Sequence, residues 1–147
     1  MRRTLRIAGA AASAAACVLA ATPGTAQAEA PGPQSLYAPS ALVLTVGQGE
    51  DANSAAVERA VTLICAPRPA GSHPSPAAAC AELTRVDGEF ASLVNNNTSD
   101  IICTKEWRPV TVTANGVWNG KRVGWSATFS NRCMMKAGLG EGAVLNF

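Results

Sequence analysis

Histidine, charge and aromatic side chains are scarce in this sequence of 147 residues, which has one histidine, 15% charged residues and 5% aromatic residues. Catalysis by a serine, histidine and aspartate group needs a histidine that a carboxylate holds beside the nucleophile. The single histidine, His73, lies in a proline-rich stretch that is poorly suited to fixing such a geometry. The acidic residues are scattered, without the apolar surroundings that tune carboxyl groups for catalysis. We therefore interpret His73 as a solvated loop residue and predict that the protein is not an enzyme.

Closely spaced metal ligands are also missing from the sequence. Beyond the N-terminal segment the nearest cysteines, Cys65 and Cys80, are fifteen positions apart, whereas structural zinc sites use cysteine or histidine pairs a few residues apart. We predict no metal ion and no other cofactor. The one long apolar run, over residues 7–21, is shorter than the roughly 20 residues that a membrane-spanning helix needs, so the mature form is not expected to bind a membrane.

The N-terminal residues have the order of a secretory signal peptide. Three arginines precede the apolar run, and a small-residue triplet follows it at residues 26–28. We predict a signal peptide over residues 1–28 and a secreted, extracellular protein. The remaining 147 minus 28, or 119 residues, fit one compact domain over residues 29–147.

Removing the leader changes the charge and the cysteine count. The signal peptide contains three of the twelve basic residues and none of the ten acidic residues, so the mature chain has a net charge of nine minus ten, or minus one. Nucleic acid is therefore not an expected partner. Cys17 leaves as well. The other four cysteines predict two disulfides in an exported chain. Four cysteines allow three pairings, and the residues alone do not choose among them.

The N-terminal half of the mature chain alternates between β-rich runs and turn signals. Runs over residues 41–46 and 59–66 predict two strands, with a turn beginning at residues 47–49. The proline-rich stretch over residues 67–76 predicts an exposed loop. Ser75 as N-cap and Pro76 at the first position predict a helix that carries Cys80 on its buried side. Val86, Phe90, Leu93 and Val94 recur at helical spacing with an interruption at residues 87–88, so one or two short helices fit this region.

The C-terminal third alternates again, which predicts a small antiparallel sheet and an α+β fold. Asn115-Gly116 and Asn119-Gly120 are predicted at turns, because Asn-Gly between alternating apolar residues is typical of hairpins. We interpret Trp118, Trp125 and Phe129 as core or sheet-face packing, with a dimer contact as the alternative.

The segment over residues 101–109 carries the most informative combination of side chains. Lys105 lies two residues after a cysteine and is followed by an acid, an aromatic residue and, at the end, Pro109. By pattern alone, Lys105 and Arg108 are adequately explained as solvating charges of an ordinary exposed loop. The residues by themselves leave open whether this loop binds a partner.

Several short motifs along the chain are similar to those of a known family, and both their order and the spacing of the cysteines match that family. They are residues 35–47 and 58–63, Cys65-Ala66-Pro67, His73-Pro74, Ala79-Cys80-Ala81, Gly116-Val117-Trp118, residues 120–123, and Phe129-Ser130-Asn131 before Cys133. Over about residues 36–147 the chain resembles the Streptomyces subtilisin inhibitor family. The resemblance implies a five-stranded antiparallel sheet with two short helices, a homodimer, and disulfides Cys65–Cys80 and Cys103–Cys133.

The resemblance also implies a function and a site. Family members inhibit subtilisin by the standard mechanism, and many members with a basic reactive-site residue also inhibit trypsin, so the implied partners are subtilisin-like and trypsin-like serine proteases. Their reactive bond lies two residues after the third mature cysteine, which here joins Lys105 to Glu106. The founding member has Pro, Met and Val where this chain has Thr104, Lys105 and Glu106. The expected loop and its support also include Ile102, Cys103, Trp107 and Asn131, whose side-chain amide is implied to brace the loop.

Two alternatives to inhibition remain from the sequence. One is an extracellular binding module whose loop proteases cut quickly and irreversibly. The other is a structural protein that is cross-linked through exposed lysines and Gln48 as a transglutaminase substrate.

Overall fold

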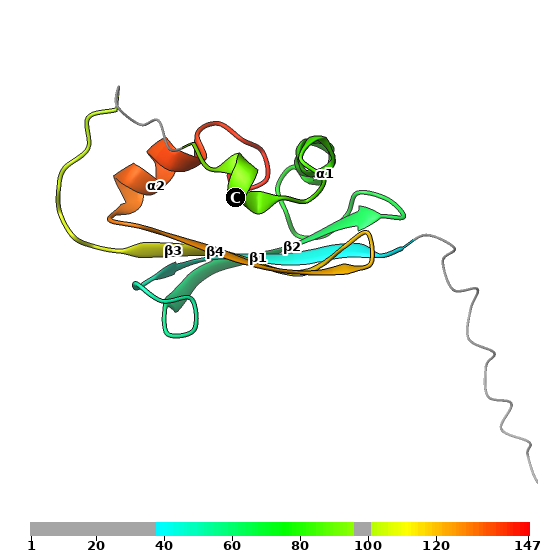
Figure 1. The fold of residues 1–147 in the computed structure, drawn as a ribbon, viewed down its shortest axis with the longest axis horizontal. Helices are drawn as coiled ribbons and strands as arrows, with labels where there is room; N and C mark the ends of the chain where they lie inside the picture. Colours follow the sequence, from blue (N-terminus) through cyan, green and yellow to red (C-terminus); the bar gives the residue numbers. More distant parts are fainter. Residues whose placement is uncertain (1–37, 96–100) are drawn as a thin grey trace, which may run out of the picture. The chain divides into compact units, whose positions relative to one another are not determined.

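The computed structural model describes residues 38–95 and 101–147. The strands are β1 (Ser40–Gln48), β2 (Ala56–Ala66), β3 (Val110–Trp118) and β4 (Lys121–Phe129). The helices are α1 (Pro76–Arg85), the 3-10 helix η1 (Phe90–Leu93) and α2 (Arg132–Leu139). The strands form one antiparallel sheet in the order β2-β1-β3-β4. All three helices lie on the same face of it (Figure 1).

The predicted α+β class, the antiparallel sheet and the two disulfides are confirmed, as are the two short helices that the resemblance implied. The sequence pattern located α1 but not α2. Within residues 38–95 and 101–147 the sheet has four strands, so the five strands implied by the resemblance are not confirmed. Beyond the paired strands, an isolated bridge joins Ile64 to Ala70 beside β2. Among these same residues no helix is long and apolar enough to span a membrane.

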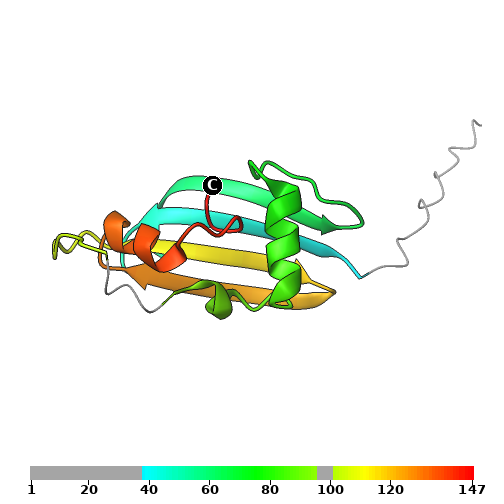
Figure 2. The same cartoon turned by 90° about the horizontal axis from the view of Figure 1, so that it is seen from above.

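The core lies between the sheet and the helices. In β1 the alternating residues Leu42, Leu44 and Val46 are buried, whereas Val43 between them is 44% exposed, as expected for a strand with one covered face. Buried residues from the other elements and from the C-terminal segment complete the core, namely Val61, Leu63, Ala79, Cys80, Leu83, Phe90, Val110, Val112, Ala114, Trp118, Met135, Leu139, Val144 and Leu145. Figure 2 shows α1 crossing the strands near one end of the sheet and α2 lying near the other.

The predicted aromatic packing is confirmed. Trp118 is buried, and its indole N–H donates to Asp87 Oδ1 at 3.4 Å. The ring of Trp125 stacks on that of Phe90 with centroids 5.5 Å apart, and Phe129 packs partly buried against the core. Trp125 therefore helps attach η1 to the sheet, and Trp118 helps attach the segment before η1.

One of the two predicted Asn-Gly turns is wrong. Asn119-Gly120 forms the β3–β4 turn with φ values of 47° and 76°, the left-handed backbone that this pair supplies. Asn115-Gly116 instead lies inside β3, where Gly116 pairs opposite Leu42. A Cβ at Gly116 would collide with the carbonyl oxygen of Ala41, so this glycine permits close backbone approach rather than a turn.

Smaller differences affect the other predicted elements. Strand β1 continues through Gln48, so the first turn begins two residues later than predicted. Pro76 begins α1 after Ser75 as predicted, and Cys80 is buried, but the side chain of Ser75 makes no capping hydrogen bond. The predicted interruption at Asp87 and Gly88 is confirmed, since both residues adopt positive φ, and after it the chain forms only the single 3-10 turn of η1 instead of a second α-helix.

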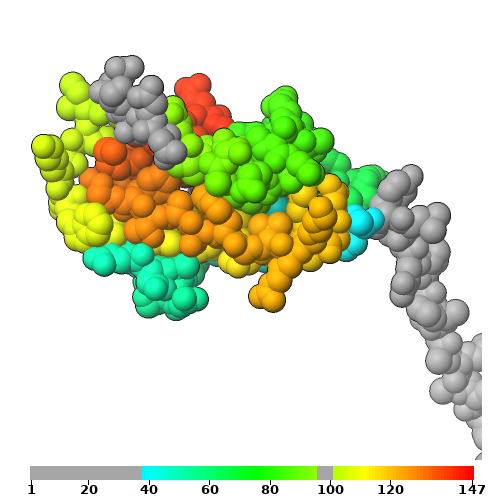
Figure 3. Space-filling view, in the orientation of Figure 1, coloured from blue at the N-terminus to red at the C-terminus, as the bar shows by residue number. Residues whose placement is uncertain are grey.

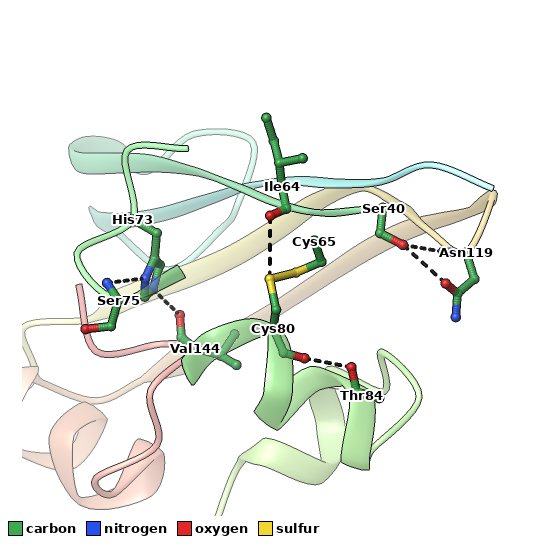
Figure 4. Close-up of a disulfide and its surroundings, with 9 residues drawn as sticks. All are labelled: Ser40, Ile64, Cys65, His73, Ser75, Cys80, Thr84, Asn119 and Val144. Atoms are coloured by element: carbon green, nitrogen blue, oxygen red, sulfur yellow. Dashed lines mark hydrogen bonds between the residues drawn. A yellow bond between two sulfur atoms is a disulfide. The ribbon is translucent and has the colours of Figure 1, made fainter. Parts of the chain in front are cut away.

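His73 is buried, and the prediction of a solvated histidine is therefore wrong. It is only 4% exposed, although its neighbours in the loop are exposed as predicted. Its Nδ1 accepts the backbone N–H of Ser75 at 3.1 Å, so Nε2 carries the proton and donates to the Val144 carbonyl oxygen at 3.1 Å (Figure 4). His73 thus joins the proline-rich loop to the C-terminal segment. His73 and Val144 are 71 positions apart in the sequence, so no local pattern reveals this contact.

Replacing His73 with alanine is expected to lower the free energy of unfolding by about 2 kcal/mol, because it opens a cavity and leaves the Val144 carbonyl without its donor. Urea denaturation measures the change. The matched control is Ser75→Ala, which removes a side chain without a capping hydrogen bond and should change stability by less than about 0.5 kcal/mol. A loss of stability in Ser75→Ala as large as that in His73→Ala would contradict the stabilising role assigned to the hydrogen bond between His73 and Val144.

Candidate functional site

The segment over residues 101–109 leads into β3 without helix or strand structure and arches away from the end of the sheet that carries α2 (Figure 1). Figure 3 shows its yellow-green atoms projecting at the edge of the molecule. Ile102 is 99% exposed and Trp107 62%, and Thr104, Lys105 and Glu106 between them are exposed as well. The predicted reactive-loop residues are therefore presented to solvent as one continuous surface segment.

A disulfide holds the beginning of this loop. Cys103 is bonded to Cys133 in the first turn of α2, with a Cα–Cα distance of 5.8 Å. The other disulfide, Cys65–Cys80, joins the end of β2 to α1 at the opposite end of the sheet (Figure 4). Only the Cys103–Cys133 disulfide therefore constrains the exposed loop directly.

Asn131 holds the centre of the loop. It follows the end of β4 and is the N-cap of α2, where its Oδ1 accepts the backbone N–H of Met134 at 3.0 Å. Its Nδ2 donates to the carbonyl oxygens of Thr104 at 2.9 Å and Glu106 at 3.0 Å. The side chain is buried, so the two carbonyls on either side of Lys105 are fixed by one rigidly placed amide.

The end of the loop is held by the sheet. The N–H of Arg108 donates to the Ser130 carbonyl at 2.8 Å. The carbonyl of Pro109 accepts from the side-chain amide of Gln48 at 2.6 Å and from the backbone N–H of Gly49 at 2.9 Å. Gln48 is half-buried by this contact, so its description as an exposed residue is wrong.

Two side-chain contacts accompany these backbone contacts. The indole N–H of Trp107 donates to Glu50 Oε1 at 2.8 Å. Glu106 Oε1 lies 3.8 Å from Arg108 Nε, and both side chains are largely exposed, so this ion pair contributes little to stability.

The structure brings the predicted reactive-bond, loop and support residues to one place, together with Cys133, and adds partners that sequence reasoning missed. Cys65 and Cys80 lie apart from them, at the opposite end of the sheet. Asn131 contacts the loop at the two positions flanking Lys105, and Cys133 anchors Cys103. Gln48 and Glu50 are the missed residues. They lie 61 and 57 positions from their loop partners, a separation at which the sequence carries no local signal.

This arrangement suits binding by a partner. An exposed peptide segment whose backbone is already held in one shape loses little conformational freedom when a partner binds it. In the described part of the chain no group of three or more histidine, cysteine, aspartate or glutamate residues could hold a metal ion.

Comparison with known families assigns the chain to one of them. The model of the subtilisin inhibitor-like family matches residues 38–131, more than half of the chain. The chain belongs to this family. Subtilisin inhibitor-like proteins are protease inhibitors, so the chain is assigned to a family of inhibitors and not of enzymes.

Individual relatives agree with the assignment of this subtilisin inhibitor-like chain. It is 74% identical to a subtilisin inhibitor of Streptomyces violaceus, over the whole length of both chains. It is 52% identical to kexstatin-1 of Streptomyces platensis, over 96% of this chain and 98% of the relative. Among solved structures it resembles sermetstatin of Streptomyces caespitosus, crystallised in complex with Bacillus licheniformis subtilisin. That match has a TM-score of 0.70 and 47% identity, and covers 74% of this chain and 99% of the other.

Proposed function

We propose that the protein is a secreted, standard-mechanism inhibitor of serine proteases, with the peptide bond between Lys105 and Glu106 as its reactive bond. The observation that carries the proposal is the buried amide of Asn131, which binds the carbonyl oxygens of Thr104 and Glu106 around an exposed Lys105. A merely solvated loop needs no such support on both sides of one residue. The complex of sermetstatin with subtilisin supports a serine protease as the partner.

In this mechanism the protease binds the loop as a substrate but releases the product very slowly. Before cleavage the loop already has its bound shape, so association loses little conformational entropy. After cleavage the disulfide at Cys103 and the bond from Asn131 to Thr104 hold the new carboxyl end. The new amino end at Glu106 stays attached through Asn131 and strand β3. Because the two ends stay adjacent, rejoining them is effectively intramolecular and competes with release.

Lys105 supports two classes of protease as targets. Its ammonium group can pair with an acidic residue at the base of a trypsin-type pocket. Its four-carbon stem can lie along the apolar wall of a subtilisin-type pocket while the charge reaches water. Ile102, three residues earlier and 99% exposed, adds an apolar side chain that a protease subsite would remove from water. We therefore propose both subtilisin-like and trypsin-like proteases as targets.

The test is a titration of active-site-quantified subtilisin and trypsin with the mature protein. We expect stoichiometric loss of both activities, with the inhibitor remaining largely intact in the complex. Rapid cleavage after Lys105 without inhibition would instead identify a binding or structural protein that keeps the fold.

Asn131→Ala is expected to speed hydrolysis of the reactive bond by about a hundredfold, because both carbonyl contacts that keep the cleaved ends together are lost. Chromatography of the inhibitor during incubation with catalytic amounts of protease gives the rate. Asn131→Asp is the control for the helix cap. It keeps an oxygen for the Met134 N–H but turns a second oxygen, in place of the amide donor, toward the carbonyls of Thr104 and Glu106, so it should be cleaved at least as quickly as the alanine variant although the cap is retained. Slow cleavage of both variants would dismiss the bracing role.

We also propose an extracellular homodimer, with residues 1–28 as the removed signal peptide and residues 29–147 as the inhibitor domain. The signal peptide lies outside the described residues. The face of the sheet opposite the helices carries Val43, a large apolar side chain that is 44% exposed. A second copy packed on that face would remove it from water. Sedimentation velocity of the mature protein tests the dimer.

A further inference from the structure

Trp107 combines high exposure with a fixed direction. The side chain is 62% exposed, yet its indole N–H donates to Glu50 Oε1 at 2.8 Å. Large aromatic side chains left in water and held in one orientation are typical of binding surfaces, because they offer much contact area and lose little freedom when they bind. Trp107 is the second residue after the proposed reactive bond, on the side opposite Lys105.

The backbone beneath Glu50 is itself well supported. The carbonyl oxygen of Glu50 accepts the hydroxyl of Thr128 in β4 at 3.0 Å. Next to it, the Gly49 carbonyl accepts the hydroxyl of Thr111 in β3 at 2.8 Å, and the Gly49 N–H donates to Pro109 in the loop at 2.9 Å. Figures 1 and 2 show the β1–β2 turn and the loop before β3 emerging at the same end of the sheet. The backbone at Gly49 and Glu50 is therefore held by hydrogen bonds to β3, β4 and the loop, and is not a freely moving turn.

We infer that Glu50 is a positioning residue that fixes Trp107 as a second anchor side chain, for a protease with an apolar subsite on the leaving-group side of the reactive bond. The inference rests on the proposed function, since Trp107 has this place only if the bond joins Lys105 to Glu106. A carboxylate oxygen is a strong acceptor for an indole N–H, so the pair holds the ring even though both groups face water.

Holding the ring in advance improves affinity without adding a contact to the protease. A free tryptophan side chain loses rotamer freedom on binding, whereas a ring already fixed has lost it in the unbound inhibitor. Direct binding of the protease by Glu50 is the competing explanation. The two differ in one respect: positioning requires the N–H of Trp107, and direct binding does not.

A double-mutant cycle separates the two explanations. Glu50→Ala, Glu50→Gln, Trp107→Phe and the double variant Glu50→Ala/Trp107→Phe are compared by their inhibition constants for subtilisin. Phenylalanine keeps an aromatic ring but has no N–H. We expect Glu50→Ala to weaken inhibition by about fivefold when residue 107 is tryptophan and to have no effect when it is phenylalanine. Glu50→Gln keeps an acceptor oxygen and should restore most of the affinity.

An equal loss in both backgrounds, or no loss in either, would overturn the inference. A second readout needs no protease. The indole N–H signal of Trp107 in a nitrogen-15 NMR spectrum is identified by its absence in Trp107→Phe, and it should move upfield in Glu50→Ala as the hydrogen bond is lost. An unchanged signal would refute positioning by Glu50. If the wild type inhibits no serine protease, the proposed function fails, and the NMR signal still decides whether Glu50 orients Trp107.

Discussion

Lys105→Asp is expected to weaken inhibition of trypsin by about a thousandfold or more, because it replaces a cation by an anion in a pocket whose base is acidic. The variant loses the contacts of the lysine side chain in the pocket. In addition, its carboxylate is repelled by the acidic residue of the pocket, in a site from which water is excluded. Inhibition of subtilisin should fall as well, since a carboxylate must give up its hydration to enter an apolar pocket. Titration of active-site-quantified enzymes, followed to the inhibition constant, measures both effects.

Three further variants make this result specific to the reactive bond. Lys105→Arg keeps the charge and should retain inhibition of trypsin. Lys105→Met should lose inhibition of trypsin and retain inhibition of subtilisin. Arg108→Asp makes the same charge change three residues later, at an exposed side chain whose nearest ionic partner is the exposed Glu106. It should alter either inhibition constant by less than about tenfold. A large loss with Arg108→Asp together with a small loss with Lys105→Asp would place the reactive bond elsewhere.

Removing the disulfide between Cys103 and Cys133, with serine at both positions, is expected to convert the inhibitor into a substrate. The disulfide is the covalent cross-link on the carboxyl side of the reactive bond. Without it, the hydrogen bond from Asn131 to Thr104 is the contact that the described residues provide to hold that side after cleavage. We expect hydrolysis of the bond to become faster by about a hundredfold or more, because the cleaved ends separate before they rejoin. The lost closure of a 30-residue loop should also lower the free energy of unfolding by about 3–4 kcal/mol.

The second disulfide provides a matched control. Serine at both Cys65 and Cys80 opens a loop of 15 residues and should cost about 3 kcal/mol of stability. That disulfide lies at the end of the sheet where Ser40 pairs with Ala66, whereas the reactive loop is at the end where Gln48 pairs with Val110. Under conditions where both variants are folded, only the loss of Cys103–Cys133 should accelerate cleavage. Equal acceleration in both would mean that global stability, and not the local tether, protects the bond.

The parts of the fold that depend on local pattern could be predicted from the sequence. Leu42, Leu44 and Val46 alternate with more exposed residues, and Asn119-Gly120 makes the turn that its chemistry favours. The failures are residues whose role is set by a distant partner. Gly116 is a glycine because the backbone of Ala41 passes close to it, and His73 is buried because the C-terminal segment covers it. Neither neighbour can be inferred from the residues that flank it in the chain.

The candidate site, too, could be predicted only in part from local pattern. The residues over 101–109 predict an exposed loop but do not indicate whether it binds a partner. The prediction of a reactive bond between Lys105 and Glu106 depends on the family resemblance. The contacts of Asn131 agree with the role that the resemblance implied. The support from Gln48 and Glu50 was missed, because it depends on how β1 pairs with β3 beneath the loop.

The support of the loop passes largely through main-chain atoms. The carbonyls of Thr104, Glu106 and Pro109 and the N–H of Arg108 make main-chain hydrogen bonds to the rest of the domain. The indole N–H of Trp107 adds one from a side chain. Every amino acid supplies a carbonyl, and all but proline supply the N–H. New side chains at residues 104–106 can therefore be tried, by natural variation or by selection from a library, without rebuilding the scaffold. The side chains of the loop can therefore change, and with them the protease that the loop fits, while the hydrogen bonds that hold the loop stay the same.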